Sequence, residues 1–479
     1  MKRLPFLLLM FALFSCAPAE EEVSVVQLFE APEGILPSND VEAAVNEEDV
    51  FVYDTRVNHD HTWSWETPIT TNPVVLFDFD NFAAVSLTYP NEITSVVIRP
   101  LALNVSASID GNTVSFVLSE PRSYVVEVNG DVTQAVHIFT NYIDHDAPDP
   151  SNLPEDMIYY GPGVHQIGTV QLSSNDHVYI AGGAYLEGQF KGYNVSNVII
   201  EGRGIISGES FVRDSEHWFI PYEFIQSDHL VLEGITILDP AGWAIHSNFN
   251  TDVLISRVNI ITARQNGDGI SLQSNHNVNV KYVFARTWDD SLVVKNYDNG
   301  TSSNIEFDEI TIWTDLAQSM EIGYETNGAS IDNVTFQNIT VLHNFHKPVI
   351  SIHNGDQAII SNITYRNIVI EDAQTIGDER YVLTDNLLIE LAIVDHSIWS
   401  SSSTRGQIDG VLFDEIFIMD GRNDLRIRIA GYDDLHQISN VVFRNVTVLN
   451  EPISSTSNMV FVLDYTNNIL FEHDEDSSE

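Results

Sequence analysis

The chain has 479 residues, of which 69 are acidic and 21 are Lys or Arg, so its formal net charge is −48. This excess of negative charge argues against nucleic acid as a partner, because binding to phosphates needs a basic surface. The single cysteine, Cys16, excludes an intramolecular disulfide and a cysteine-ligated metal. We expect no metal and no cofactor.

The first 16 residues have the layout of a secretory signal. Lys2 and Arg3 precede an apolar run over residues 4–14, which is too short to cross a bilayer. The run ends in Leu-Phe-Ser-Cys, which is similar to a bacterial lipobox, where the cysteine becomes the lipidated first residue of the mature protein. We therefore expect a signal peptide over residues 1–15 and a lipid anchor on Cys16 in the bacterial outer membrane. An ordinary cleaved signal is the alternative.

The next segments predict a linker and a first folded domain. Residues 16–50 are rich in Glu, Pro, Asn and Ser, which predicts a linker after the lipidated N-terminus. Residues 51–150 hold short runs rich in Val, Ile, Thr and Tyr between turn residues, as in residues 92–98 and 113–118. This alternation predicts an antiparallel β-sandwich. Residues 144–154, with three prolines and three aspartates, predict the connector to a second domain.

A sequence repeat begins after Met157. Segments that alternate apolar residues, then carry Asn or Asp before more apolar residues, start at Val253, Val278 and Asn304 and recur toward the C-terminus. Their spacing holds two or three short strands plus corners, and helical periodicity is nearly absent. The pattern predicts an all-β chain in which a right-handed parallel β-helix over residues 151–479 follows the sandwich. We expect a monomer.

Two neighbouring repeats carry acidic residues at matching positions. Aligning Ile270 with Leu292 places Asp268 beside Asp290 on the adjacent coil, about 4.8 Å away. Asp289 can face the same groove only if it lies at a corner or bulge, because consecutive strand residues point to opposite faces. Glycoside hydrolysis with inversion needs one carboxylic acid as proton donor and one carboxylate to activate water. Solvated turn residues are the alternative interpretation of these acids.

Several motifs accompany these acids: Thr62-Trp63-Ser64-Trp65 and residues 96–100, 158–165, 178–185 and 202–209. With Gly267-Asp268-Gly269 and Asp289-Asp290, they resemble glycoside hydrolase family 49, the dextranase and isopullulanase family, and more distantly the polygalacturonase family. The resemblance covers most of the mature chain. It implies an inverting hydrolase with Asp289 as general acid and Asp268 and Asp290 as the bases that position water. Gly267 stands where the family has Thr.

Residues near the three acids are candidate substrate ligands. Trp243 aligns with Asp268 one coil earlier, and Lys295 follows the Asp289-Asp290 pair on the same coil. Residues 316–324 lie where polygalacturonases carry a Gly-His-Gly motif. This segment has no histidine, which argues against pectin as the substrate. This segment supplies Gln318, which aligns with Asp290, together with Glu321 and Tyr324.

Other aromatic and histidine residues carry weaker signals. Trp313 falls in the apolar pattern of its repeat, so we assign it to the core. Histidines lie on different coils without a metal-ligand spacing, and we expect them in the cleft or on the surface: His246, His343, His346 and His353.

The expected function is endo-acting, inverting hydrolysis of an extracellular polysaccharide. A dextran-like α-glucan is the first substrate expectation, and a marine galactan or a pectin-like polymer is the alternative. Two other classes also fit the sequence, a β-helix polysaccharide lyase and a non-catalytic glycan-binding lipoprotein.

Overall fold

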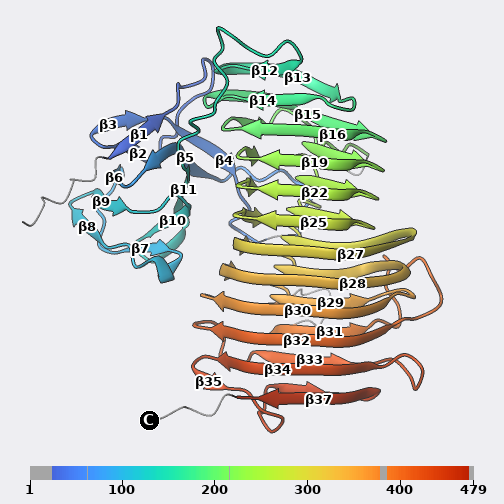
Figure 1. Cartoon of the computed structure of the whole chain (residues 1–479). Helices are drawn as coiled ribbons and strands as arrows, with labels where there is room; N and C mark the ends of the chain where they lie inside the picture. The colour runs from blue at the N-terminus through green and yellow to red at the C-terminus, as the bar shows by residue number, and fades with distance from the viewer. Residues whose placement is uncertain (1–23, 62, 215, 378–385, 474–479) are drawn as a thin grey trace, which may run out of the picture.

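The computed structural model describes residues 24–473 except 62, 215 and 378–385. The expected signal peptide and Cys16 lie outside the described residues. Almost every element is a β-strand, and the strands form two small sheets followed by one long sheet of 26 strands (Figure 1). In the described part of the chain, no helix is long and apolar enough to span a membrane.

The two N-terminal sheets pack into a sandwich. One has the order β1-β5-β11-β10-β7 with β4 added beside β5, and the other has the order β3-β2-β6-β9-β8. Their pairings are antiparallel except for β11 on β5. The elements are β1 (Val25–Leu28), β2 (Glu42–Val45), β3 (Glu48–Val50), β4 (Val52–Arg56), β5 (Thr71–Asp80), β6 (Ala83–Thr88), β7 (Val96–Arg99), the 3-10 turn η1 (Leu101–Leu103), β8 (Ala107–Asp110), β9 (Thr113–Leu118), β10 (Ser123–Val128) and β11 (Asp131–Asn141).

The sandwich begins earlier than its predicted boundary. Strands β1 to β3 fall within residues 16–50, which we had assigned to a linker. Val41, Ala43 and Val45 are buried in the sandwich core, where β2 pairs with β6. The linker prediction is therefore wrong from Val25 onward, because these short runs gain their stability from strands far along the chain.

The long sheet is a parallel β-helix, so the predicted all-β architecture is confirmed. Its strands stack coil on coil down the right of Figure 1, and β34 with β35 is an antiparallel pair near the end. The first half comprises β12 (Met157–Tyr160), β13 (Gly163–Gln171), β14 (His177–Ile180), β15 (Ala184–Tyr193), β16 (Ser196–Gly202), β17 (Ile205–Ser207), β18 (Tyr222–Ile225), β19 (Asp228–Glu233), β20 (Thr236–Leu238), β21 (Ile245–Asn248), β22 (Thr251–Ser256), β23 (Asn259–Ile261), β24 (Ile270–Gln273), β25 (His276–Lys281) and β26 (Phe284–Thr287). The second half comprises β27 (Leu292–Thr314), β28 (Met320–Asn344), β29 (Ile350–Asn354), β30 (Ile359–Ile370), β31 (Leu387–Ile393), β32 (Gln407–Ile418), β33 (Arg426–Ala430), β34 (Ile438–Val448), β35 (Glu451–Pro452), β36 (Val460–Val462) and β37 (Thr466–Glu472).

The repeat observed in the sequence fills the helix interior and shapes its corners. Inside, aromatic rings on successive coils stack, as Phe307 does on Phe336 with centroids 4.7 Å apart. At one corner, Asn277, Asn304 and Asn333 adopt positive φ, and each donates a side-chain hydrogen bond to the residue one coil earlier. Asn tolerates this left-handed conformation better than most residues, which explains why Asn recurs at this corner in most repeats.

The sandwich lies against the flank of the helix (Figure 1). Their shared core includes Phe139 from the sandwich with Phe284 and the fully buried Trp313 from the helix, which confirms the assignment of Trp313 to the core. Buried ion pairs also cross this boundary, including Arg203 Nε with Asp78 Oδ2 at 2.7 Å. The sandwich is therefore held in a fixed position beside the coils that carry the acids.

Candidate active site

The predicted register of the acidic coils is confirmed. Ile270 pairs with Leu292 across β24 and β27, and the N–H of Gly269 donates to the carbonyl of Asp290 at 2.8 Å. Asp268 precedes β24, whereas Asp289 and Asp290 lie between β26 and β27. The pair thus occupies a corner, as a shared groove requires, and Asp268 lies beside it on the neighbouring coil.

Gly267 is explained by its close neighbours. A Cβ atom at this position would lie 2.7 Å from both the Arg264 carbonyl oxygen and Thr262 Oγ1. Thr262 Oγ1 donates to the Gly267 carbonyl at 2.6 Å and accepts from the N–H of Trp288 at 2.9 Å. The Thr262 hydroxyl therefore connects the two acid-bearing loops in the space that a side chain at 267 would occupy.

The three carboxyl groups form one electrostatic cluster. Burial raises the pKa of Asp268 to about 8, and the charge of Asp289 adds to that rise. Burial also raises the pKa of Asp290 well above its ordinary value, and the charges of Asp289 and Asp268 raise it further. The pKa of Asp289 is raised by burial too, although Lys347 and Lys295 oppose the shift. Carboxyl groups with raised pKa values stay protonated at a higher pH than ordinary aspartates do, so such a cluster can supply both a proton donor and an ionised base.

Lys295 is part of this cluster. Its Nζ atom lies 3.7 Å from Asp268 Oδ2 and 3.6 Å from Glu325 Oε2, and its side chain is buried. Tyr297 donates a hydrogen bond to Glu325 at 3.0 Å. The structure therefore shows Lys295 in ion pairs with two acids, and its contact with substrate stays a prediction.

The candidates of the following coil have different surroundings. The N–H of Gln318 donates to Asp290 Oδ1 at 3.2 Å, which confirms that Gln318 lies beside Asp290. Glu321 is fully buried and lies 2.9 Å from Nδ1 of His353, so the structure shows it paired with this histidine, and its contact with substrate stays a prediction. Tyr324 stacks on His353 with centroids 4.2 Å apart and covers it.

The predicted position of His353, in the cleft or on the surface, is wrong. The residue is buried between Glu321 and Glu390, whose Oε2 lies 3.0 Å from His353 Nε2, rather than exposed in the cleft. These two carboxylates raise the pKa of His353 to about 10 although burial opposes them. Arg428 Nη1 donates to Glu390 at 2.5 Å and extends the series of alternating charges by one coil. His343 is likewise buried, 2.6 Å from Glu127 Oε1.

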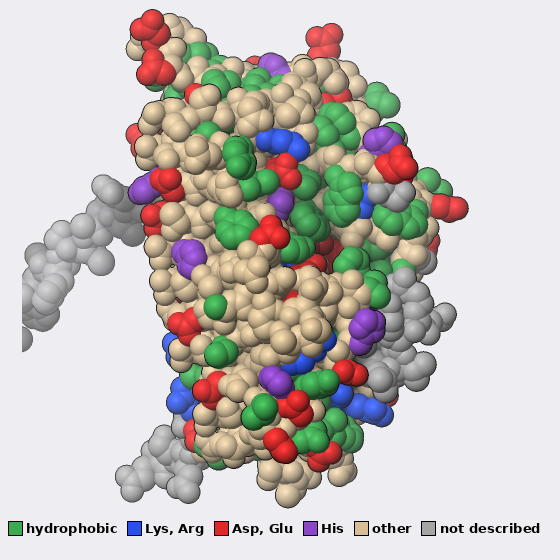
Figure 2. Space-filling view, turned by 90° about the vertical axis from the view of Figure 1, so that its right-hand side faces the viewer, with side chains coloured by type: hydrophobic (Ala, Val, Ile, Leu, Met, Phe, Trp, Pro, Cys, Tyr) green, Lys and Arg blue, Asp and Glu red, His purple; other side chains and the backbone are tan. Residues whose placement is uncertain are grey.

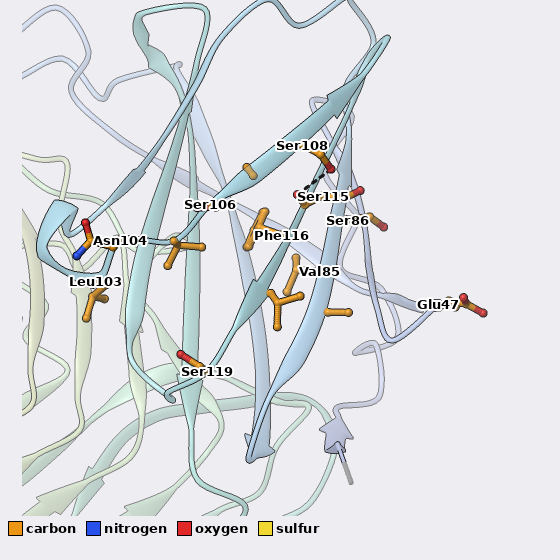
Figure 3. Close-up of a pocket in the computed structure, with 14 residues that line it drawn as sticks. Glu47, Val85, Ser86, Leu103, Asn104, Ser106, Ser108, Ser115, Phe116 and Ser119 are labelled. Atoms are coloured by element: carbon orange, nitrogen blue, oxygen red, sulfur yellow. Dashed lines mark hydrogen bonds between the residues drawn. The ribbon is translucent and has the colours of Figure 1, made fainter. Parts of the chain in front are cut away.

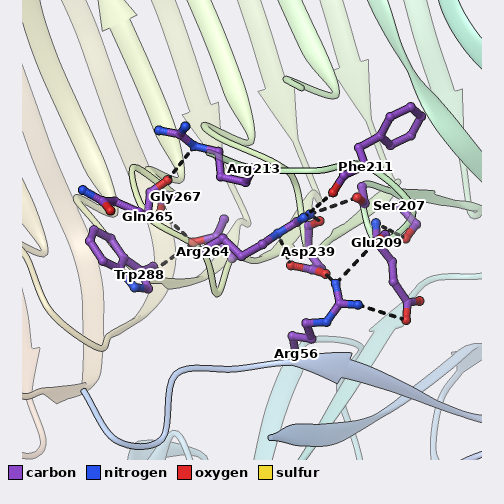
Figure 4. A network of polar contacts seen from close by, with 12 residues as sticks. Arg56, Ser207, Glu209, Phe211, Arg213, Asp239, Arg264, Gln265, Gly267 and Trp288 are labelled. Atoms are coloured by element: carbon purple, nitrogen blue, oxygen red, sulfur yellow. Dashed lines mark hydrogen bonds and ion pairs between the residues drawn. The ribbon is translucent and has the colours of Figure 1, made fainter. Parts of the chain in front are cut away.

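A network of polar contacts joins Arg56, Asp239 and Arg264 (Figure 4). Arg264 donates to the carbonyls of Phe211 at 2.6 Å and Gly208 at 2.9 Å, and it forms an ion pair with Asp239. Arg56 from the sandwich pairs with the same Asp239 carboxylate. Despite these two cations, burial raises the pKa of Asp239 to about 6. The network ties the sandwich to the segment that precedes Asp268.

Aromatic residues border the acids. Trp243 is partly exposed, and Lys295 Nζ lies 5.8 Å from its ring. Trp63, from the sandwich segment between β4 and β5, packs edge-on against Trp288, the residue before Asp289, with centroids 5.1 Å apart. Figure 2 shows acidic side chains recessed at mid-height of one face with hydrophobic side chains gathered around them. Apart from Trp243, sequence reasoning missed these neighbours, although it singled out the motif that contains Trp63.

Another hollow lies on the sandwich, over strands β6, β8 and β9 (Figure 3). Small side chains such as Ser86, Ser108 and Ser115 line it, and Glu47 is the only charged residue among the described residues of its lining. It therefore lacks the pair of carboxyl groups that glycoside hydrolysis requires. Across residues 24–473, as far as they are described, no group of three or more His, Cys, Asp or Glu side chains is arranged to hold a metal ion.

Comparisons with known proteins agree with this geometry. Residues 161–377 match the model of glycosyl hydrolases family 28. The matched segment contains all three aspartates and most of the residues around them. No curated protein matches the chain.

One solved structure shows the same architecture. Dex49A from Penicillium minioluteum has a TM-score of 0.64 and 15% identity, over 92% of this chain and 96% of that one. An exopolygalacturonase from Thermotoga maritima has a TM-score of 0.48 and 14% identity, over 66% and 84% of the two chains. At such identities the likeness concerns the fold. Dex49A shares it over both the sandwich and the helix.

Proposed function

We propose that this protein hydrolyses glycosidic bonds of a polysaccharide with inversion of configuration. The observation that carries the proposal is the cluster of Asp268, Asp289 and Asp290 on two adjacent coils, whose pKa values are all raised by burial. An inverting hydrolase needs a carboxylic acid that is still protonated at working pH and a second carboxylate that activates water. The family 28 match over this segment supports the same chemistry.

We assign the three acids the roles that the resemblance to family 49 implies, and the placement of Asp268 beside Asp290 supports this assignment. Asp289 is the general acid that protonates the oxygen of the leaving sugar, and Asp268 and Asp290 hold and deprotonate the attacking water. Lys295 favours the ionised form of Asp268 through its positive charge. The base accepts one proton from water while the acid donates one to the glycosidic oxygen, so the pair must exchange protons with solvent before the next turnover.

The substrate we propose first is a dextran-like α-glucan cleaved within the chain. The resemblance to family 49 supports this choice, and the likeness to Dex49A over both domains is consistent with it. A marine galactan or a pectin-like polymer is the alternative. We further propose that the protein is exported and anchored to the outer membrane by a lipid on Cys16, which the signal-like segment over residues 1–16 supports.

The test is a screen of reducing-end release from dextran, pullulan, pectin and sulfated galactans. We expect one polymer to be cleaved, with dextran first, and proton NMR of the newly formed product to show the inverted anomer. A product that absorbs in the ultraviolet would indicate an unsaturated sugar and therefore a lyase. Release from none of these polymers, together with tight binding of one, would contradict hydrolysis and favour a binding protein.

A further inference from the structure

Two tryptophans flank one arginine near the acid cluster, and a third packs against one of them. The guanidinium carbon of Arg213 lies 4.8 Å from the ring centroid of Trp65 and 3.9 Å from that of Trp218. Trp218 in turn packs edge-on against Trp243, with centroids 5.4 Å apart. Trp65 comes from the sandwich, whereas the other three residues come from the helix. We call Trp65, Trp218 and Trp243 the tryptophan platform.

Two members of the platform are exposed, which is unusual for such large apolar side chains. Trp65 is 49% exposed and Trp218 is 43% exposed. An exposed cluster of aromatic rings beside a polar site marks a binding surface, because leaving it in water is unfavourable without a ligand. Indole rings offer broad apolar faces to the C–H groups of a pyranose ring and hold them by dispersion and by exclusion of water.

Arg213 orders the platform and is not available to bind an anion. Its Nε atom donates to the Gln265 carbonyl at 3.0 Å, and Nη2 donates to Asn266 Oδ1 at 2.6 Å. Nη1 donates to the carbonyls of Asp214 and His217. With these donors engaged by the protein, the guanidinium fixes the two indoles by cation–π contact and leaves little to attract a carboxylate or sulfate.

The platform is continuous with the acid cluster. Asn266, which Arg213 holds, lies two residues before Asp268. Trp243 occupies the position of Asp268 one coil earlier, since Ile245 pairs with Ile270. A sugar chain that passes the acids and continues toward the earlier coils would therefore meet the platform next.

We propose that the tryptophan platform is a sugar-binding subsite for uncharged pyranose units of the substrate, shared between the sandwich and the helix. The inference rests on the proposed hydrolase function and narrows its substrate to a polymer that is neutral at this subsite. It also gives the sandwich a role in substrate binding, through Trp65.

The experiment measures binding and turnover in parallel. Binding of isomaltooligosaccharides of increasing length is followed by calorimetry in an Asp289→Asn background, and kcat and KM are measured with the active chain. Trp65→Ala and Trp218→Ala are the test variants, and Trp65→Tyr keeps an aromatic face if the alanine variant folds poorly. Trp399→Ala is the matched control, because Trp399 is 54% exposed and lies outside the platform.

We expect the alanine variants to bind long oligosaccharides about tenfold more weakly and to raise KM by a similar factor, with kcat nearly unchanged. The shortest oligosaccharides should bind all variants alike, Trp65→Tyr should retain most of the affinity, and Trp399→Ala should match the parent. Equal affinity in Trp65→Ala, Trp218→Ala and Trp399→Ala would overturn the proposal. So would failure of the parent to bind isomaltooligosaccharides, or equally tight binding of charged oligogalacturonides. Binding without turnover in the active chain would instead contradict the hydrolase function and leave the subsite supported.

Discussion

Lys295 Nζ lies 3.7 Å from Asp268 Oδ2, and both side chains are buried. Burial alone favours the neutral form of an aspartate, and the adjacent ammonium group opposes that effect. Lys295 and a hydrogen bond from Ser271 both favour the ionised form of Asp268, and its pKa is nevertheless about 8. The charge of Lys295 therefore helps to set the pH above which Asp268 is ionised and can act as a base.

Replacing Lys295 tests this link. In Lys295→Met the pKa of Asp268 should rise further, because the charge that lowers it is gone. The acidic limb of the kcat/KM profile should move to higher pH, and kcat at neutral pH should fall about 100-fold, the scale of losing one positioned electrostatic group. Lys281→Met, on strand β25, is the control. An unchanged pH profile in Lys295→Met would contradict the assignment of Asp268 as a base.

Asp290→Asn should stabilise the protein while it removes activity. The raised pKa of Asp290 means that the folded state binds more protons than the unfolded state above about pH 4, so stability falls as pH rises through this range. Asparagine cannot ionise, so the loss of stability on ionising this buried carboxyl group is removed. Thermal unfolding should show a higher melting temperature than the parent at pH 7 and a smaller difference at pH 4. A lower melting temperature at pH 7 would mean that the Asp290 charge stabilises the fold.

His353→Gln should destabilise the protein in a pH-dependent way. It leaves Glu321 and Glu390 as buried carboxylates without their shared cation, at a cost of about 3 kcal/mol or more. Because the pKa of His353 is raised from 6.5 to about 10, its stabilising effect is complete below pH 6.5 and is lost as pH rises through 10.

Denaturant unfolding of this variant at several pH values measures the effect. The difference from the parent should be largest near pH 6 and shrink toward pH 10. His177→Gln is the matched control, since His177 and Glu201 form a half-exposed pair at 2.7 Å, and it should change stability by less than about 0.5 kcal/mol. Equal effects of both substitutions would show that the His353 pair adds no more than a surface contact.

Gly267→Thr restores the residue that family 49 has at this position and should nevertheless be harmful. Its Cβ would lie 2.7 Å from the Arg264 carbonyl oxygen, so the Asp268 loop must shift. Overpacking of this kind costs about 1–3 kcal/mol, and we expect kcat to fall at least tenfold with it. Gly161→Thr is the control, because only Tyr159 lies close to a Cβ there. A fully active Gly267→Thr variant would show that the loop position is not fixed by Thr262.

The sequence predicted those features that follow from the alternation of apolar and polar residues. The pairing of Ile270 with Leu292 could be predicted because a shift by one residue would expose the helix interior. Asp268 and Asp290 were thereby placed side by side. Strand β1 could not be predicted, because its partner β5 lies about fifty residues away and its own apolar run is four residues long.

Side-chain pairing across coils was harder to predict. The alternation shows which residues point outward, but not that the Glu321 carboxylate faces His353 on the next coil. The position of Trp65 was equally hidden, since it depends on how the sandwich docks against a distant loop that carries Arg213. Such contacts depend on tertiary packing rather than on local periodicity.

The proposed hydrolysis depends on proton donation by Asp289. The direct measurement is kcat of Asp289→Asn on the polymer that the parent cleaves, with the dissociation constant for that polymer measured on the same sample. Asp298→Asn, an exposed acid on β27, is the control. We predict a loss of about 10³-fold in kcat with nearly unchanged binding, which is the scale of one general acid, and full activity in the control. Full activity of Asp289→Asn would contradict this role of Asp289.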